Sequence, residues 1–409
     1  MDIELRAVKD EAEAKRFMIA CEATFGDELT DDDWKDFKNV LESDRTIAAF
    51  DGDDIIGTAA AFSFRLTVPG GGEVRAAGVT VVGVLPSHRR KGVATKMMRK
   101  QLDDVRAAGE PVAILWASEG SIYQRFGYGL ATVGQQIDIP RTKTRLLNDP
   151  DRVGTVKVGV PMENVGDLSK VYDRARSERP GMVARSEKWW KHHTLRDPER
   201  HRDGGGPRFS GILEIDSEPA AYALYRMHHK WDDGSPQGHI EVKELVATSP
   251  VAEREMWRFV FDIDLTASVK AWWLPQDSPL MLMLMEPRSL KARASDSIWA
   301  RIVDVPGAFE ARSYNGSGEV VIDVSDDFCP WNEGRWSFDI SDGKARITKT
   351  DADADIKLHA RELGALYLGA FTFAELERAL RVETWTEGAI GRADDLFRTA
   401  RKPWNPEIF

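Results

Sequence analysis

The first 130 residues alternate between amphipathic helical spacing and continuous apolar runs typical of buried strands. Helical spacing over residues 8–43 is interrupted near Gly26, which predicts two helices, and Thr30 is placed to cap the second. Further segments follow from the same patterns: strands at Thr46–Phe50, Ile55–Leu66, Val74–Val84 and Pro111–Trp116, and helices at Arg89–Gly109 and Ser121–Phe126. This order predicts an α/β (α+β) architecture.

Two further regions follow the first. Proline and charged residues between 140 and 155 mark a boundary, and a second mixed pattern then runs to about residue 290. It includes a predicted strand at His239–Val246 and a predicted helix at Pro250–Phe261. A third region begins near Ala294, with several short strands and then helices from about Arg361. We therefore expect three domains, at residues 1–145, 146–292 and 293–409.

Composition narrows the classes of function. The 56 basic and 67 acidic residues give a net charge of −11, which disfavours nucleic acid as the main ligand and mildly favours a cationic partner. No apolar run reaches the roughly 18 residues of a membrane span. The two cysteines, Cys21 and Cys329, lie far apart, so we expect a reducing compartment, the cytoplasm. Adjacent histidine pairs diverge on a helix, and no metal site is expected.

The most informative segment is Val82–Ala94, where a buried strand runs through a basic turn into a helix. The start of a helix offers unpaired N–H groups and the positive end of its dipole. Gly92 and Ala94 leave room for oxygens to approach the backbone, and Arg89 and Arg90 add forks that can pair with phosphate. The segment predicts a site for a pyrophosphate.

Arg89-x-x-Gly92-x-Ala94 resembles the acetyl-CoA signature of the GNAT acetyltransferase superfamily. Six further segments resemble the Eis (enhanced intracellular survival) family of actinobacteria: Arg65–Gly70, Ala117–Gly129, Tyr222–Arg226, Pro275–Asp277, Val305–Arg312 and Leu366–Ala370. The final residue, Phe409, also resembles that family's typical last residue. The resemblance spans all three regions. It implies tandem GNAT folds, a C-terminal domain similar to sterol carrier protein 2, and a hexamer.

The resemblance also implies an N-acetyltransferase that uses acetyl-CoA to modify primary amines of small polycations such as aminoglycosides. Motif position then implies a role for each cofactor residue: backbone contacts to the pantetheine arm from Val82 and Val84, pyrophosphate contacts from Arg89, Arg90, Gly92 and Ala94, and a contact to the far arm from Ser118. Tyr123 would be the general acid and the Phe409 carboxylate the general base.

Several of these roles have alternatives. The residues alone do not choose between Tyr123 and the neighbouring Tyr128, and either ring could simply pack the short helix. An α-carboxylate lies about 7 pKa units below an amine, so Phe409 is expected to act through water or by orienting the ammonium. The expected acceptor contacts are Asp27, Glu28, Trp34 and Trp190, although tryptophans at such positions are more often core.

The central region lacks a second glycine-rich basic turn, because Thr248–Arg254 follows its strand instead. One active site per chain is therefore expected. Two other functions remain open at this point: acetylation of lysine in proteins or peptides, and a non-catalytic scaffold that binds acyl-CoA or lipid.

Overall fold

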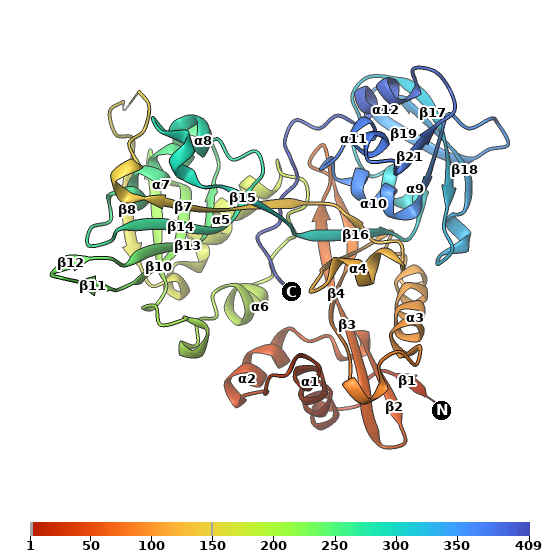
Figure 1. Cartoon of the computed structure of the whole chain (residues 1–409), viewed down its shortest axis with the longest axis horizontal. Helices are drawn as coiled ribbons and strands as arrows, with labels where there is room; N and C mark the ends of the chain where they lie inside the picture. The colour runs from red at the N-terminus through yellow and green to blue at the C-terminus, as the bar shows by residue number, and fades with distance from the viewer. Residues whose placement is uncertain (1–2, 149) are drawn as a thin grey trace. The chain divides into compact units, whose positions relative to one another are not determined.

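The computed structural model describes residues 3–148 and 150–409, which form two compact units. The first contains the chain up to Thr132 together with Ser297–Ala400 and Glu407–Phe409. The second contains Val133–Asp296 and Arg401–Pro406. Each unit is built around its own seven-stranded sheet, and the first carries an additional five-stranded sheet (Figure 1).

The first sheet mixes antiparallel strands with one parallel pair. Its order is β1 (Glu4–Arg6), β2 (Thr46–Asp51), β3 (Asp54–Thr67), β4 (Glu73–Val84), β5 (Val112–Trp116), β16 (Ile298–Ile302) and β6 (Gly129–Leu130). Only β4 and β5 run parallel, and α3 (Val93–Ala107) connects them. The short α4 (Gly120–Gln124) follows β5.

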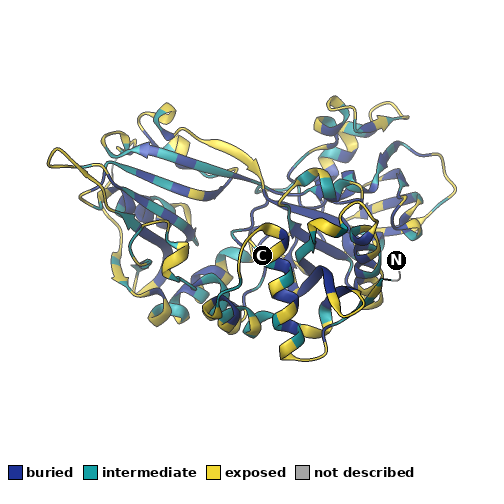
Figure 2. Ribbon diagram, turned by 60° about the horizontal axis from the view of Figure 1, so that its bottom comes forward, coloured by how far each residue is buried: buried dark blue, intermediate teal, exposed yellow. Residues whose placement is uncertain are grey.

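Helices cover both faces of this sheet because its strands are apolar on both sides. α1 (Glu11–Phe25) and α2 (Asp31–Val40) pack on one face, and α3 packs on the other. Successive residues of β2 show the alternation, since Ala48 contacts the α1 side and Ala49 the α3 side. Figure 2 shows the central strands buried, with exposed residues on the outer helix surfaces.

The second sheet has the same connectivity as the first. Its order is β8 (Thr155–Gly159), β9 (Phe209–Ile215), β10 (Glu218–His228), β13 (His239–Ala247), β14 (Ser268–Pro275), β7 (Val133–Pro140) and β15 (Arg293–Asp296). Its parallel pair is β13 and β14. The unit also contains α5 (Val165–Arg176), α6 (Glu187–Trp189), α7 (Pro250–Asp262), α8 (Leu280–Met283) and the ribbon β11 (Trp231–Asp232) and β12 (Ser235–Pro236).

The two sheets exchange strands. β7 follows β6 along the chain but belongs to the second sheet, whereas β16 follows β15 and belongs to the first. The division therefore falls at Thr132/Val133 and Asp296/Ser297, while the sequence placed its boundaries at 145 and 292. The three-domain division stays a prediction.

The five-stranded sheet belongs to the first unit. Its order is β19 (Lys344–Lys349), β18 (Gly334–Ser341), β17 (Gly318–Ser325), β20 (Ile356–His359) and β21 (Val382–Thr384), with helices α9 (Val305–Phe309), α10 (Ala360–Tyr367), α11 (Phe373–Arg378) and α12 (Ala389–Phe397). Two glycines allow α10 to approach the first sheet closely. A Cβ on Gly364 would lie 2.1 Å from the Ala300 oxygen, and one on Gly129 would lie 1.7 Å from the Arg361 oxygen.

Most predicted elements of the first region are confirmed, including the Gly26 break and the Thr30 cap. The predicted start of the helix at Arg89 was wrong, because α3 begins at Val93. Arg90 (φ 61°) and Gly92 (φ 81°) have left-handed backbone that an α-helix cannot contain. The cations therefore lie in the turn before the helix.

Candidate active site

The site begins where β4 separates from β5. The parallel pairing of these strands ends at Val79 and Leu115, so the last residues of β4 have an edge that β5 does not pair. A β-bulge lies in this stretch, where β4 has one residue more than β3 and Val81 adopts φ 47°. Such a conformation is uncommon for a β-branched residue, and the Val81 oxygen is held by the Thr58 hydroxyl at 2.8 Å. Residues Val82–Val84 are half-buried.

The start of α3 supplies hydrogen-bond donors to the same place. Its N-cap is Gly92, and no side chain among the described residues caps this start, unlike those of α1, α2 and α7. The first N–H groups of a helix have no partner within the helix. Together with the exposed cations of the preceding turn, they form a region that attracts anions.

A cavity of about 680 Å³ opens between these elements. Its walls include every residue that the sequence assigned to the cofactor, together with the proposed acid: Val82, Val84, Arg89, Arg90, Gly92, Ala94, Ser118 and Tyr123. They also include residues that the sequence did not assign: Thr24, Phe25, Gly83, His88, Val93, Thr95, Glu119, Ile122 and Arg125. Thr24 and Phe25 come from α1, which is distant in sequence from the other lining residues. The local sequence gives no signal for such a contact.

Arg89 also forms hydrogen bonds to the protein backbone. Its Nε donates to the Val84 oxygen (3.2 Å) and its Nη2 to the Thr24 oxygen (3.0 Å). These bonds connect the end of α1 to the end of β4 beside the cavity. A guanidinium has five N–H groups, so the remaining ones stay available to a ligand.

The two tyrosines that the sequence could not separate have different surroundings. Tyr123 is 6% exposed and lines the cavity, whereas Tyr128 is fully buried behind it and is not part of the lining. The rings pack edge to face with centroids 5.9 Å apart. Burial raises the pKa of Tyr123 to about 12 and raises that of Tyr128 further. Tyr123 is therefore the phenol that a ligand can reach.

Phe409 and the expected acceptor residues are not among the lining residues in the described part of the chain. The Phe409 ring packs edge to face on Phe64, with centroids 4.9 Å apart. Trp34 is 7% exposed within the core formed by α1 and α2. Asp27 and Glu28 are exposed in the loop after α1, next to the cavity residue Phe25.

Trp190 is 2% exposed inside the second unit. Its ring packs edge to face on Tyr172 at 5.6 Å, and the Arg185 guanidinium lies 4.4 Å from its centroid. Arg185 in turn pairs with buried Glu244. These contacts are those of a core residue.

The comparisons with known proteins agree with this geometry. Residues 4–131 and 181–302 match models of an acetyltransferase (GNAT) domain, and residues 305–406 match a sterol carrier protein domain. The chain is 42% identical to an uncharacterized N-acetyltransferase of Streptomyces avermitilis over 91% of both chains. It is 33% identical to the N-acetyltransferase Eis of Mycobacterium tuberculosis over 93% of both. This chain is an Eis-like N-acetyltransferase of the GNAT superfamily.

The crystal structure of Eis1 from Mycobacterium abscessus is similar over the full length of both chains, with a TM-score of 0.85 and 33% identity. The Eis-like family assignment confirms the tandem GNAT folds followed by a sterol-carrier-like domain. A GNAT fold implies acetyl-CoA as co-substrate. The residues present fit this molecule, because an uncapped helix start, exposed cations and an open strand edge lie around one cavity.

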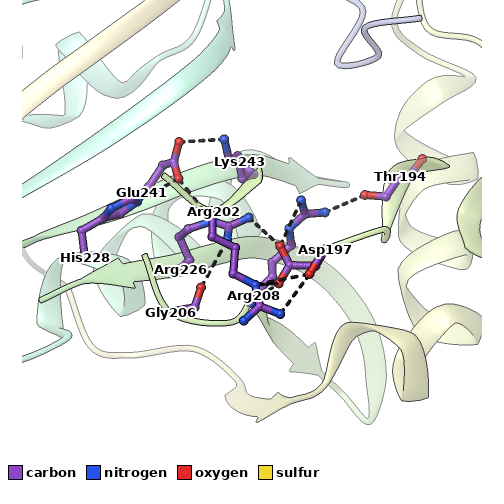
Figure 3. Close-up of polar contacts among 9 residues, drawn as sticks. All are labelled: Thr194, Asp197, Arg202, Gly206, Arg208, Arg226, His228, Glu241 and Lys243. Atoms are coloured by element: carbon purple, nitrogen blue, oxygen red, sulfur yellow. Dashed lines mark hydrogen bonds and ion pairs between the residues drawn. The ribbon is translucent and has the colours of Figure 1, made fainter. Parts of the chain in front are cut away.

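A different polar cluster occupies the second unit of this Eis-like chain (Figure 3). Asp197 pairs with Arg226 at 2.7 Å and Arg202 at 3.1 Å, and Glu241 contacts His228 at 3.1 Å and Lys243 at 2.7 Å. Burial alone would raise the pKa of Asp197, but hydrogen bonds from Arg208 and Arg226 lower it overall. The two carboxylates of this cluster are shared by four cationic side chains, Arg202, Arg208, Arg226 and Lys243.

Within residues 3–148 and 150–409, no three His, Cys, Asp or Glu side chains are grouped to hold a metal ion. None of the helices in these ranges combines the length and the apolar character that a bilayer crossing needs.

Proposed function

We propose that this enzyme transfers the acetyl group of acetyl-CoA to primary amines of small polycationic acceptors such as aminoglycosides. One observation supports this most strongly. A single cavity combines the open edge of β4, the uncapped start of α3, a basic turn and the buried phenol of Tyr123. A pantetheine arm with a pyrophosphate at one end and a thioester at the other matches that order of groups.

Each wall of the cavity has a role in this proposal. The Val82 and Val84 backbone pairs with the amides of the pantetheine arm. The pyrophosphate is held by the turn and the helix start, through Arg89, Arg90, Gly92 and Ala94. Ser118 contacts the far arm. Bound acetyl-CoA supplies the thioester carbonyl and the thiolate leaving group.

The amine nitrogen attacks the thioester carbon, so that a C–N bond forms and the C–S bond breaks. Tyr123 donates its phenolic hydrogen bond to the departing sulfur. The Phe409 carboxylate orients the acceptor's ammonium and stabilises its charge, because direct proton transfer to an α-carboxylate is uphill by about 7 pKa units. The amine attacks in its neutral form, after the ammonium proton has exchanged with solvent buffer, and the proton that the nitrogen loses as the amide forms is taken up by the departing thiolate. Asp27 and Glu28 attract the cationic acceptor, and Trp34 packs in the core formed by α1 and α2.

The remaining parts of the proposal concern the whole protein. The chain has three domains, at 1–145, 146–292 and 293–409, assembles as a hexamer and works in the cytoplasm. Mass photometry at nanomolar concentration tests the hexamer separately from activity.

The test of activity is a thiol-release assay with acetyl-CoA over a panel of amines, followed by mass spectrometry of the products. We expect aminoglycosides to have a higher kcat/KM than lysine peptides and to gain acetyl groups. A higher kcat/KM for lysine peptides would refute the proposed acceptor class and favour protein or peptide lysine as the acceptor. Thiol release with no acetylated amine would refute N-acetyl transfer to the panel. Deleting Phe409 should lower kcat by about 100-fold, the lower end of general acid–base effects, at unchanged KM for acetyl-CoA.

A further inference from the structure

The sheet of the second unit opens in the same way as that of the first. Its parallel pairing ends at Val242 and Ala271, and β13 and β14 separate beyond that point. In the first sheet the corresponding gap holds a cavity of about 680 Å³, but here only about 30 Å³ is left. The walls of this small space come from β13, β14, α5 and α7, and from Arg401 and Trp404. The C-terminal segment therefore fills the gap.

Directed hydrogen bonds hold this segment in place. The backbone N–H of Trp404 donates to the Pro180 oxygen at 2.9 Å. Arg179 Nη1 donates to the Lys402 oxygen at 2.9 Å and to Asp277 Oδ1 at 2.6 Å, and Asp277 Oδ2 accepts from the Lys402 N–H at 3.1 Å. Trp404 is 3% exposed, and burial of an indole of this size is a large apolar contribution.

The start of α7 offers little to a pyrophosphate. Pro250 has no N–H, and the Ser249 hydroxyl already accepts from the Ala252 N–H at 3.2 Å. Glu253 adds a carboxylate to the first turn. The gap keeps the geometry of a GNAT cofactor groove without its anion-binding end.

We propose that residues 401–406 are the resident occupant of this second groove, and that Arg179, Asp277 and Trp404 are positioning residues for the chain terminus. Phe409 lies three residues beyond Pro406. Three residues span at most about 11 Å, so docking of the segment keeps Phe409 within that distance of Pro406. The docking stands on its own contacts, and its effect on catalysis rests on the proposed role of Phe409.

The test uses the full-length enzyme with the substitution Asp277→Ala, which removes the acceptor of Lys402 N–H and the partner of Arg179. Hydrogen exchange should show protected amides at Lys402 and Trp404 in the unsubstituted enzyme, and exchange at least about 10-fold faster in the variant. kcat should fall by about 10-fold or more while KM for acetyl-CoA stays within about twofold, because the first cavity is untouched.

Three further variants make the result specific. Asp277→Asn keeps one acceptor oxygen but turns an NH2 group toward the other donor, so it should restore protection and kcat only in part. Asp262→Ala breaks an exposed pair with Arg152 in the same unit and should change neither. If Asp277→Ala does not fold, Trp404→Ala carries the same expectations.

Rapid exchange of the Lys402 and Trp404 amides in the unsubstituted enzyme would overturn the docking. So would unchanged protection in Asp277→Ala. A loosened segment with unchanged kcat would uphold the docking and overturn the role of Phe409 instead.

Discussion

Replacing Tyr123 with phenylalanine should remove most of the activity without weakening acetyl-CoA binding. The phenol lines the cavity, and its hydroxyl is the group that the proposed reaction needs. Removing one hydrogen-bond donor to developing negative charge costs about 10² to 10³ in rate, so Tyr123→Phe should lower kcat by that range. Its KM for acetyl-CoA should stay within about threefold, because the pyrophosphate contacts are retained.

Burial changes how this phenol can act. With a pKa of about 12 for Tyr123 and about 8.5 for a thiol, full proton transfer to the thiolate is uphill by about 3.5 pKa units, or about 5 kcal/mol. An ordinary tyrosine near pKa 10 would face about 2 kcal/mol. Tyr123 should therefore stabilise the departing thiolate by hydrogen bonding as the C–S bond breaks, and the thiolate then takes up the proton that the attacking nitrogen loses.

The same pKa fixes the pH dependence. A raised pKa keeps the phenol protonated through the ordinary tyrosine range, and the donor is lost only as the pH rises through about 12. The kcat profile should therefore show no alkaline decline from this group up to about pH 10.5, within its raised range. A decline near pH 10 that disappears in Tyr123→Phe would contradict the effect of burial.

Tyr128→Phe is the matched control. Its hydroxyl is buried with no hydrogen-bond partner among the described residues, and a buried unpaired polar group costs about 1–3 kcal/mol. The control should keep kcat and raise the free energy of unfolding by about 1 kcal/mol in urea. If Tyr123→Phe retained full kcat, or Tyr128→Phe lost it, the assignment of the phenol would be refuted.

Three other predictions follow from the site. Arg90→Ala should raise KM for acetyl-CoA by about 10-fold at unchanged stability. Arg89→Ala should raise KM in the same way and also lower the free energy of unfolding by about 1 kcal/mol, because Arg89 connects α1 to β4. Equal melting temperatures for the two variants would contradict this. Gly78→Ala places a Cβ 2.2 Å from the Phe64 ring, should lower the free energy of unfolding by about 1–3 kcal/mol in chemical denaturation, and should lower kcat by displacing the terminal ring. Its control is Gly391→Ala in α12, whose Cβ meets no atom within 4 Å and which should not destabilise the protein, because alanine is the better helix former. Calorimetry should find one acetyl-CoA per chain, and a second site would contradict the filled groove of the second sheet.

The sequence predicted elements whose signals are local. The Gly26 break and the Thr30 capping box depend on residues within one turn, and both are confirmed. The strand–turn–helix from Val82 to Ala94 is also local, which is why all its assigned residues line one cavity. The predicted start of α3 was wrong because Arg90 and Gly92 have left-handed backbone. The amino-acid pattern of the turn does not indicate that conformation.

Long-range features could not be read in this way. The exchange of β7 and β16 depends on pairing with β14 and β5, far along the chain. Trp34 and Trp190 were expected at an acceptor site, but an aromatic residue gives the same local signal in a core. β20 and β21 are short and lie among residues expected to be helical or irregular.

The two GNAT folds of this chain separate what topology provides from what side chains provide. Both sheets place a parallel pair at their centre, and both pairs diverge after a few residues, so the gap is a property of the fold. What fills each gap depends on the start of the helix that follows the first strand of the parallel pair, α3 in the first sheet and α7 in the second. Gly92 has no side chain to cap the first N–H groups of α3, which lie beside two arginines. In α7 the Ser249 side chain accepts from a first-turn N–H, and Pro250 has none. A groove without an anion-binding end still buries apolar surface, and the indole of Trp404 supplies that surface from the same chain.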